Sequence, residues 1–238
     1  MRLFCFPCAG GTADFFNQLD PWFSPAIELV KLEYAGHGTR HREPLYQDFA
    51  QLAEDLYAEV KSRHRSGGDY ALFGYSMGSV AAAEVLHRIL RKGELPPPER
   101  VFLAAHGPSV KRELLRFQGN EADEWVKERT IFLGGVPEKL RDNRTFWRVY
   151  LPLYRADYTL ITNYEFDRLT LACEVPLTGL YGAGDLSPEE MWAWSRYFQG
   201  ECEFVEFPGN HFFITEYGRE MAERMESRLR KGGSEDGV

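Results

Sequence analysis

The most informative stretch of the chain is Gly74-Tyr75-Ser76-Met77-Gly78, a G-x-S-x-G pentapeptide. An apolar, strand-like run (residues 70–73) precedes it, and an alanine-rich run typical of a helix (residues 79–86) follows it. A strand that turns directly into a helix at a serine crowds its backbone, so the flanking positions must be small, and glycine meets this need. This setting predicts a nucleophilic Ser76, with the Met77 amide at the positive end of the new helix, where it can receive an oxyanion. The alternative is an ordinary tight turn whose serine has no chemical role.

Candidate partners for the serine follow in the order that this architecture requires, the acid first and then the histidine. A predicted strand over residues 176–181 ends in Gly182-Ala183-Gly184-Asp185, a small-residue turn that presents a carboxylate. A later strand, residues 203–207, leads into a loop that contains His211. A serine hydroxyl needs an imidazole base, and the imidazole needs a carboxylate that fixes its tautomer. We therefore expect Ser76, Asp185 and His211 to form a catalytic triad.

Other acids and histidines fit these roles less well. The strand after the serine turn, residues 101–105, runs into His106-Gly107-Pro108 and offers no carboxylate, so Asp185 stands nearly alone. Asp157 is the next acid to consider if Asp185 proves dispensable. His211 alone among the six histidines lies between a predicted strand and a predicted helix. The other five are expected at the surface or packed in loops, although His37 lies in a glycine-flanked loop that could approach the site: His37, His41, His64, His87 and His106.

A second oxyanion donor should come from the loop after an early strand. Residues 2–6 form that predicted strand, and Pro7-Cys8-Ala9-Gly10-Gly11-Thr12 follows it. Successive small residues let backbone amides approach a tetrahedral intermediate closely, and glycines permit positive φ. Without the triad, a plain glycine turn would be the better interpretation.

Four segments match the motifs of one enzyme family in the family's order. Phe6 to Thr12 is similar to F-P-x-A-G-G-S, residues 74–78 to G-H-S-M-G, residues 151–158 to L-P-x-x-R-A-D-F, and residues 209–213 to G-G-H-F-F. By these motifs, which span nearly the whole chain, the protein resembles the type II (external) thioesterases of nonribosomal peptide and polyketide synthases, within the α/β-hydrolase superfamily.

The resemblance implies a fold, a reaction and a set of site residues. The fold is α/β, with a mostly parallel central sheet flanked by helices and an inserted helical lid. The reaction is hydrolysis of acyl or aminoacyl thioesters on the phosphopantetheine arms of acyl or peptidyl carrier proteins, in an editing role, without metal or cofactor. Ser76, Asp185 and His211 are then catalytic, and the backbone amides of Ala9 and Met77 form the oxyanion hole.

The chain departs from the family's motifs at several positions, none of them in the triad. Tyr75 replaces a common histidine, Asn210 a second glycine, and Cys8 an aromatic residue or histidine, while residues 35–40 are a loose version of a P-G-R or P-G-H-G loop. These differences bear on the shape of the acyl pocket.

The rest of the chain predicts a single domain, residues 1–238. Strands and helices alternate, with a second strand at residues 27–32 and a helix whose apolar face includes Phe49, Leu52 and Leu56. Residues 111–174 interrupt the alternation with a long helical pattern, which suits a lid inserted between core strands. Residues 231–238 have a composition typical of disorder.

Two patterns in the predicted lid have open interpretations. An apolar face is either internal packing or the roof of an acyl pocket; it consists of Phe146, Val149, Tyr150, Leu153, Tyr154, Tyr158 and Ile161. A basic cluster at the start of the long lid helix is either a solvated helix face or a patch that steers an acidic carrier protein; it consists of Lys139, Arg141, Arg144 and Arg148, the arginines falling near one face.

Charge, hydropathy and cysteine content limit the possible partners, the cellular location and the chance of a metal or redox site. The formal net charge of −8 argues against nucleic acid and anionic membrane as partners. The 238 residues contain no apolar run near the ~20 residues needed to span a bilayer and no apparent secretion signal, so we expect a cytoplasmic protein. We also expect a monomer. Cys5 and Cys8 have redox-motif spacing, but no second pair accompanies them, which favours buried or pocket-lining thiols over a metal or redox site.

Two other functions stay open on the sequence. A small-molecule carboxylesterase or an acyltransferase could use the same triad, although the opening motif and the lid motif do not favour it. A non-catalytic binding protein with a hydrolase fold is the third candidate, and labelling of Ser76 by a fluorophosphonate would exclude it.

Overall fold

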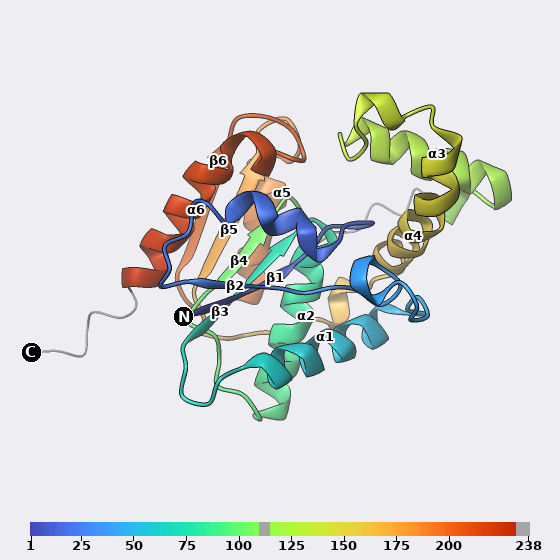
Figure 1. Cartoon of the computed structure of the whole chain (residues 1–238). Helices are drawn as coiled ribbons and strands as arrows, with labels where there is room; N and C mark the ends of the chain where they lie inside the picture. Colours follow the sequence, from blue (N-terminus) through green and yellow to red (C-terminus); the bar gives the residue numbers. More distant parts are fainter. Residues whose placement is uncertain (110–114, 232–238) are drawn as a thin grey trace, which may run out of the picture.

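Six parallel strands form the central sheet of the computed structural model, which describes residues 1–109 and 115–231 (Figure 1). Their order in the sheet is β2-β1-β3-β4-β5-β6, and every neighbouring pair is parallel. The strands are β1 (Arg2–Phe6), β2 (Glu28–Lys31), β3 (Tyr70–Tyr75), β4 (Val101–Ala104), β5 (Leu177–Gly182) and β6 (Cys202–Phe207). The predicted fold class, a mostly parallel α/β sheet with inserted helices, is confirmed.

Helices cover both faces of this sheet. Helices α1 (Phe49–Arg63) and α2 (Met77–Lys92) pack on one face, and α6 (Ile214–Lys231) packs on the other. The remaining α-helices of the described residues are the short α5 (Pro188–Trp192) and the two helices of an insertion, α3 (Gly119–Phe132) and α4 (Arg144–Thr162). Alternate side chains of β1 show the two-sided core: Phe4 packs in one cluster with α1 and α2, and Leu3 packs in the other with α6. A sheet buried on both faces needs nearly continuous apolar strands, which explains the apolar strand-like runs in the sequence.

The helical insertion, defined here as α3 and α4, lies between β4 and β5 in the chain and apart from the sheet in space (Figure 1). It has a small core of its own, which includes Val126, Trp147 and Tyr154. Residues 110–114, of which 111–114 belong to the predicted lid, and residues 232–238 of the predicted tail lie outside the described residues.

Two predictions for this insertion need correction. Val149 is 53% and Tyr150 38% exposed, so the predicted apolar face is not continuous. Phe146 packs against the core of the insertion, and the C-terminal part of the face lies toward the rest of the protein. The helix begins at Arg144, because the Asn143 side chain caps it by accepting a hydrogen bond from the Phe146 amide (2.9 Å). Arg141 therefore precedes the helix, and the predicted three-arginine helix face is reduced to two.

Candidate active site

The serine turn holds Ser76 in an unusual backbone conformation. Ser76 has φ 55° and ψ −121° and directly precedes α2. Its two flanking glycines are required by close contacts: a Cβ on Gly74 would lie 2.1 Å from the Gly78 carbonyl oxygen, and a Cβ on Gly78 would lie 2.0 Å from the Phe6 carbonyl oxygen. The turn is therefore packed between β3, α2 and β1, and any larger residue at either glycine would displace the serine.

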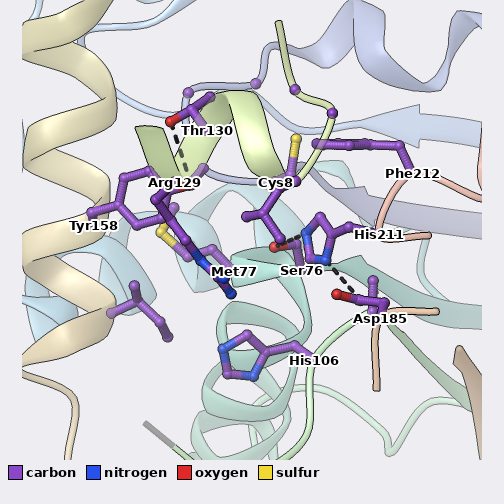
Figure 2. Close-up of a pocket in the computed structure, with 18 of the residues that line it drawn as sticks. Cys8, Ser76, Met77, His106, Arg129, Thr130, Tyr158, Asp185, His211 and Phe212 are labelled. Carbon is purple, nitrogen blue, oxygen red and sulfur yellow. Dashed lines mark hydrogen bonds and ion pairs between the residues drawn. The ribbon is translucent and has the colours of Figure 1, made fainter. Parts of the chain in front are cut away.

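The three predicted triad residues meet at the carboxyl ends of their strands (Figure 2). His211 Nε2 lies 2.9 Å from Ser76 Oγ, and His211 Nδ1 lies 2.8 Å from Asp185 Oδ2. The side chains of His211 and Asp185 are each only 8% exposed. Such a chain of hydrogen bonds lets the imidazole take a proton from the hydroxyl while the carboxylate holds its tautomer.

Hydrogen bonds between two loops fix the positions of Asp185 and His211 relative to each other. The Gly184 amide donates to the Gly209 carbonyl (2.8 Å), and the Ala183 amide donates to Phe207 (2.9 Å). The turn after β5 and the loop after β6 are thus hydrogen-bonded to each other. This close approach explains the glycines before Asp185, because a Cβ on Gly182 would lie 2.5 Å from the Asn210 carbonyl oxygen and a Cβ on Gly184 would lie 2.4 Å from Asn210 Oδ1.

Tyr75, one of the departures from the family's motifs, contacts the loop that carries His211 from the end of β3. Its hydroxyl donates to the His211 carbonyl oxygen (2.6 Å), and the side chain is completely buried. Burial raises the pKa of Tyr75 well above its ordinary value, so the hydroxyl stays protonated and remains a donor. The ring stacks on Phe212, the residue that follows the histidine.

Replacing Tyr75 by phenylalanine should therefore loosen His211 without removing any reacting group. We expect kcat to fall about three- to tenfold with KM nearly unchanged, because one hydrogen bond of about 1 kcal/mol to the histidine loop is lost. Steady-state kinetics on a small thioester would measure this. Tyr57→Phe is the matched control, since it removes a hydroxyl that bonds Glu94 far from the site. A Tyr75→Phe enzyme with unchanged kcat would limit Tyr75 to packing.

The predicted oxyanion donors are both available. Within the described residues, neither the Ala9 amide nor the Met77 amide donates a hydrogen bond to the protein. Ala9 and Ser76 line the same pocket, and Met77 is the first residue of α2. Free amides beside a nucleophile can stabilise a negative oxygen that develops during the reaction.

The pocket beside Ser76 has a volume of about 600 Å³. It lies between the loops at the carboxyl ends of the strands and the helical insertion. Tyr154, Tyr158 and Ile161 of α4 line it, so this part of the predicted apolar face does reach the pocket. Cys8 also lines it, and burial raises the pKa of its thiol to about 12, so the thiol is protonated and a poor nucleophile. Cys5 is buried, and burial raises its pKa also.

Two other histidines lie deeper than the sequence suggested. His106 lines the pocket, and Figure 2 shows its ring below Ser76 and Met77, so its assignment to the surface or to loop packing misses its proximity to the site. The sequence held a signal for this position, because His106 closely follows β4, the strand that pairs with β3 next to Ser76. His37 is completely buried and contacts Asp157, which bonds neither His211 nor Ser76. Asp157 is therefore not the acid partner of His211.

No helix in the described part of the chain is long and apolar enough to cross a membrane.

The thioesterase domain family matches residues 1–229, so the chain belongs to this family. It is 34% identical over 223 residues to a probable cadicidin biosynthesis thioesterase of Streptomyces griseus, covering 91% of this chain but 59% of that protein's length. The structure of ClbQ from the colibactin NRPS/PKS pathway superposes with a TM-score of 0.87 at 27% identity, covering 97% of each chain. The type II thioesterase BorB from the borrelidin biosynthetic cluster gives 0.83 at 26% identity, covering 96% of this chain and 92% of BorB. The resemblance drawn from four motifs is confirmed, and the protein is a thioesterase.

Proposed function

We propose that this thioesterase hydrolyses acyl or aminoacyl groups from the phosphopantetheine arms of acyl or peptidyl carrier proteins, as an editing enzyme. The observation that carries the proposal is the hydrogen-bonded chain Ser76–His211–Asp185 at the floor of a pocket. Its relatives support the substrate class, because ClbQ comes from an NRPS/PKS pathway and BorB is described as a type II thioesterase.

The proposed reaction has two halves. In the first, His211 Nε2 takes the proton of Ser76 Oγ as the oxygen attacks the thioester carbonyl, and the Ala9 and Met77 amides hold the resulting oxyanion. The C–S bond breaks, and the pantetheine sulfur leaves as a thiol with the proton from His211. In the second half, His211 takes a proton from water, which attacks the acyl–serine ester. The carboxylic acid leaves, and Ser76 regains its proton.

Pocket size favours small acyl groups over a finished peptide or polyketide. A volume of about 600 Å³ is within the range of about 300–1,000 Å³ that holds a drug-sized ligand. A short or medium acyl group and the end of the pantetheine arm therefore fit together. We propose that the enzyme removes such groups when they block a carrier protein, and that the helical insertion acts as a lid over this pocket.

The experiment is to load one carrier protein with short acyl groups and with a long peptidyl group, and to compare kcat/KM. The proposal expects faster hydrolysis of the short acyl groups. An oxygen ester of the same acyl group is the control for a carboxylesterase. Faster cleavage of the oxygen ester, or of the long peptidyl thioester, would contradict the proposed substrate class or the editing role.

Arg144 and Arg148 offer a route for carrier docking. Both are exposed at the start of α4, and neither has an ion-pair partner among the described residues. Against a net charge of −8, they give a local positive patch that could steer an acidic carrier protein. Steering contacts act mainly on the association rate and are screened by salt.

Reversing Arg144 and Arg148 to glutamate should therefore lower kcat/KM for an acyl-carrier substrate about tenfold at low salt, and much less at high salt. The same acyl group on a short pantetheine thiol should be hydrolysed as before. Arg91→Glu with Arg196→Glu is the matched control, because it reverses two exposed arginines elsewhere and changes the net charge equally. Equal losses on both substrates would indicate damage to the lid, and no loss on either would leave the two arginines as a solvated surface.

A further inference from the structure

A second buried histidine–carboxylate pair lies outside the triad. His37 Nε2 is 3.0 Å from Asp157 Oδ2, and the two side chains are 0% and 1% exposed. His37 comes from the loop after β2, and Asp157 from the C-terminal half of α4, 120 residues later. The pair therefore joins the sheet domain to the helical insertion, and the mechanism above does not use it.

The surroundings of His37 favour its charged form. Its Nδ1 lies 3.1 Å from the Ala35 carbonyl oxygen, so both ring nitrogens face acceptors, and only an imidazolium can donate to both. Burial alone would lower the pKa of His37, but the hydrogen bond and charge of Asp157, helped by the Ala35 carbonyl and Glu33, together raise it. The Tyr34 ring packs edge-on against the imidazole. Asp157 is thus a buried carboxylate that faces a buried imidazole whose contacts favour the charged form.

The same carboxylate oxygen also binds the oxyanion loop. Asp157 Oδ2 accepts a hydrogen bond from the Gly10 amide (2.7 Å), and Gly10 directly follows the proposed donor Ala9. Gly10 has φ 67°, and a Cβ there would lie 2.1 Å from Tyr154 Cε1 of α4. On the other side, the Tyr34 hydroxyl donates to the Pro7 carbonyl oxygen (2.6 Å). The loop that carries Ala9 is therefore held between the core and α4.

We propose that Asp157, fixed by His37, is a positioning residue that holds the oxyanion loop in its catalytic conformation. A charged acceptor makes a stronger hydrogen bond to an amide than a neutral one, and His37 holds the carboxylate in one position. Since Gly10 follows Ala9, a rotation of the loop would turn the Ala9 amide away from Ser76. This role rests on the proposed function of Ser76 and Ala9, and it couples the lid helix to the oxyanion hole.

The test is the Asp157→Asn enzyme on a short acyl thioester of N-acetylcysteamine. A catalytic group displaced by about 1 Å can cost on the order of a hundredfold in rate, so we expect kcat to fall about 10- to 100-fold with KM within about twofold. Binding of a trifluoromethyl ketone analogue, which forms an oxyanion on Ser76, should weaken in parallel. Asp123→Asn is the matched control, because Asp123 pairs with Arg155 inside the insertion and does not contact the loop.

His37→Gln provides a second variant if Asp157→Asn folds poorly. It keeps a donor for Asp157 but no charge, so kcat should fall by less than in Asp157→Asn. The raised pKa of His37 also has a consequence for stability. The ion pair stabilises the wild type fully below the ordinary histidine pKa, and this contribution is lost as the pH rises through the raised value. The difference in Tm between wild type and His37→Gln should therefore shrink with increasing pH.

The outcomes separate this role from the proposed function. If the wild type hydrolyses the thioester, Ser76→Ala does not, and Asp157→Asn keeps kcat and analogue affinity within about threefold of wild type, the positioning role is wrong and the proposed function stands. Equal losses in Asp157→Asn and Asp123→Asn would also contradict it, because both variants would then act through the lid alone. Activity that survives in Ser76→Ala would instead contradict the proposed function.

Discussion

Replacing Ser76 by alanine should reduce thioester hydrolysis by about 10⁴-fold or more while the protein stays folded. Loss of the nucleophile of a serine triad removes the covalent route and leaves only binding and oxyanion stabilisation. The structural cost is small, because Ser76 Oγ bonds only His211 among the described residues, and alanine meets the same backbone strain at φ 55° as serine. Hydrolysis rates with a small thioester, with Tm as the measure of folding, would check this expectation.

A fluorophosphonate adds an independent readout of Ser76. The wild type should be labelled at Ser76, and Ser76→Ala should not be labelled at all. Turnover by Ser76→Ala within about tenfold of the wild type would refute the assignment of the nucleophile. Labelling of another residue of the pocket would refute it in the same way.

Replacing Asp185 by asparagine should lower kcat by about 10⁴-fold, although the side chain keeps its shape. An amide can present its NH₂ group to His211 Nδ1, which places the imidazole proton on Nε2, facing Ser76 Oγ. In that tautomer the histidine cannot accept the serine proton. The variant should fold with a Tm close to that of the wild type, because the packing around the side chain is unchanged.

Asp14→Asn is the matched control for this variant. Asp14 lines the mouth of the same pocket, but its carboxylate accepts from Asn17 rather than from a triad member. It should retain nearly full activity. A near-normal Asp185→Asn enzyme would mean that the acid lies elsewhere. Asp157 is not a substitute, since it bonds His37 and the Gly10 amide.

Local sequence was sufficient to predict the meeting of the three triad residues. Ser76, Asp185 and His211 each follow a strand-like run, and the carboxyl ends of parallel strands meet at one edge of the sheet. Glycines at positions 74 and 78 mark the crowded serine turn. The strand-like runs and the glycines lie within a few residues of the side chains that they position. The triad could therefore be predicted from the strand pattern and the order of the residues along the chain.

Contacts between the insertion and the core could not be predicted in this way. Asp157 and His37 meet across 120 residues, and nothing near either residue indicates the other. The periodicity of α4 indicates an apolar face, but it does not say what covers that face. Tyr154 is buried against the oxyanion loop, whereas Val149, on the preceding turns, is exposed. Similarly, Tyr75 at the end of β3 reaches the His211 carbonyl only because the loop after β6 packs against it.

The most direct measurement of the central claim is the capture of an acyl-enzyme from a carrier-bound substrate. Wild-type enzyme is mixed with an acyl-carrier protein, quenched in acid within one turnover, digested and examined by mass spectrometry. The proposed function predicts the mass of the acyl group on the peptide that contains Ser76, formed at least as fast as kcat. Release of the acyl group from the carrier with no acyl group on Ser76, or with the acyl group on Cys8, would contradict it.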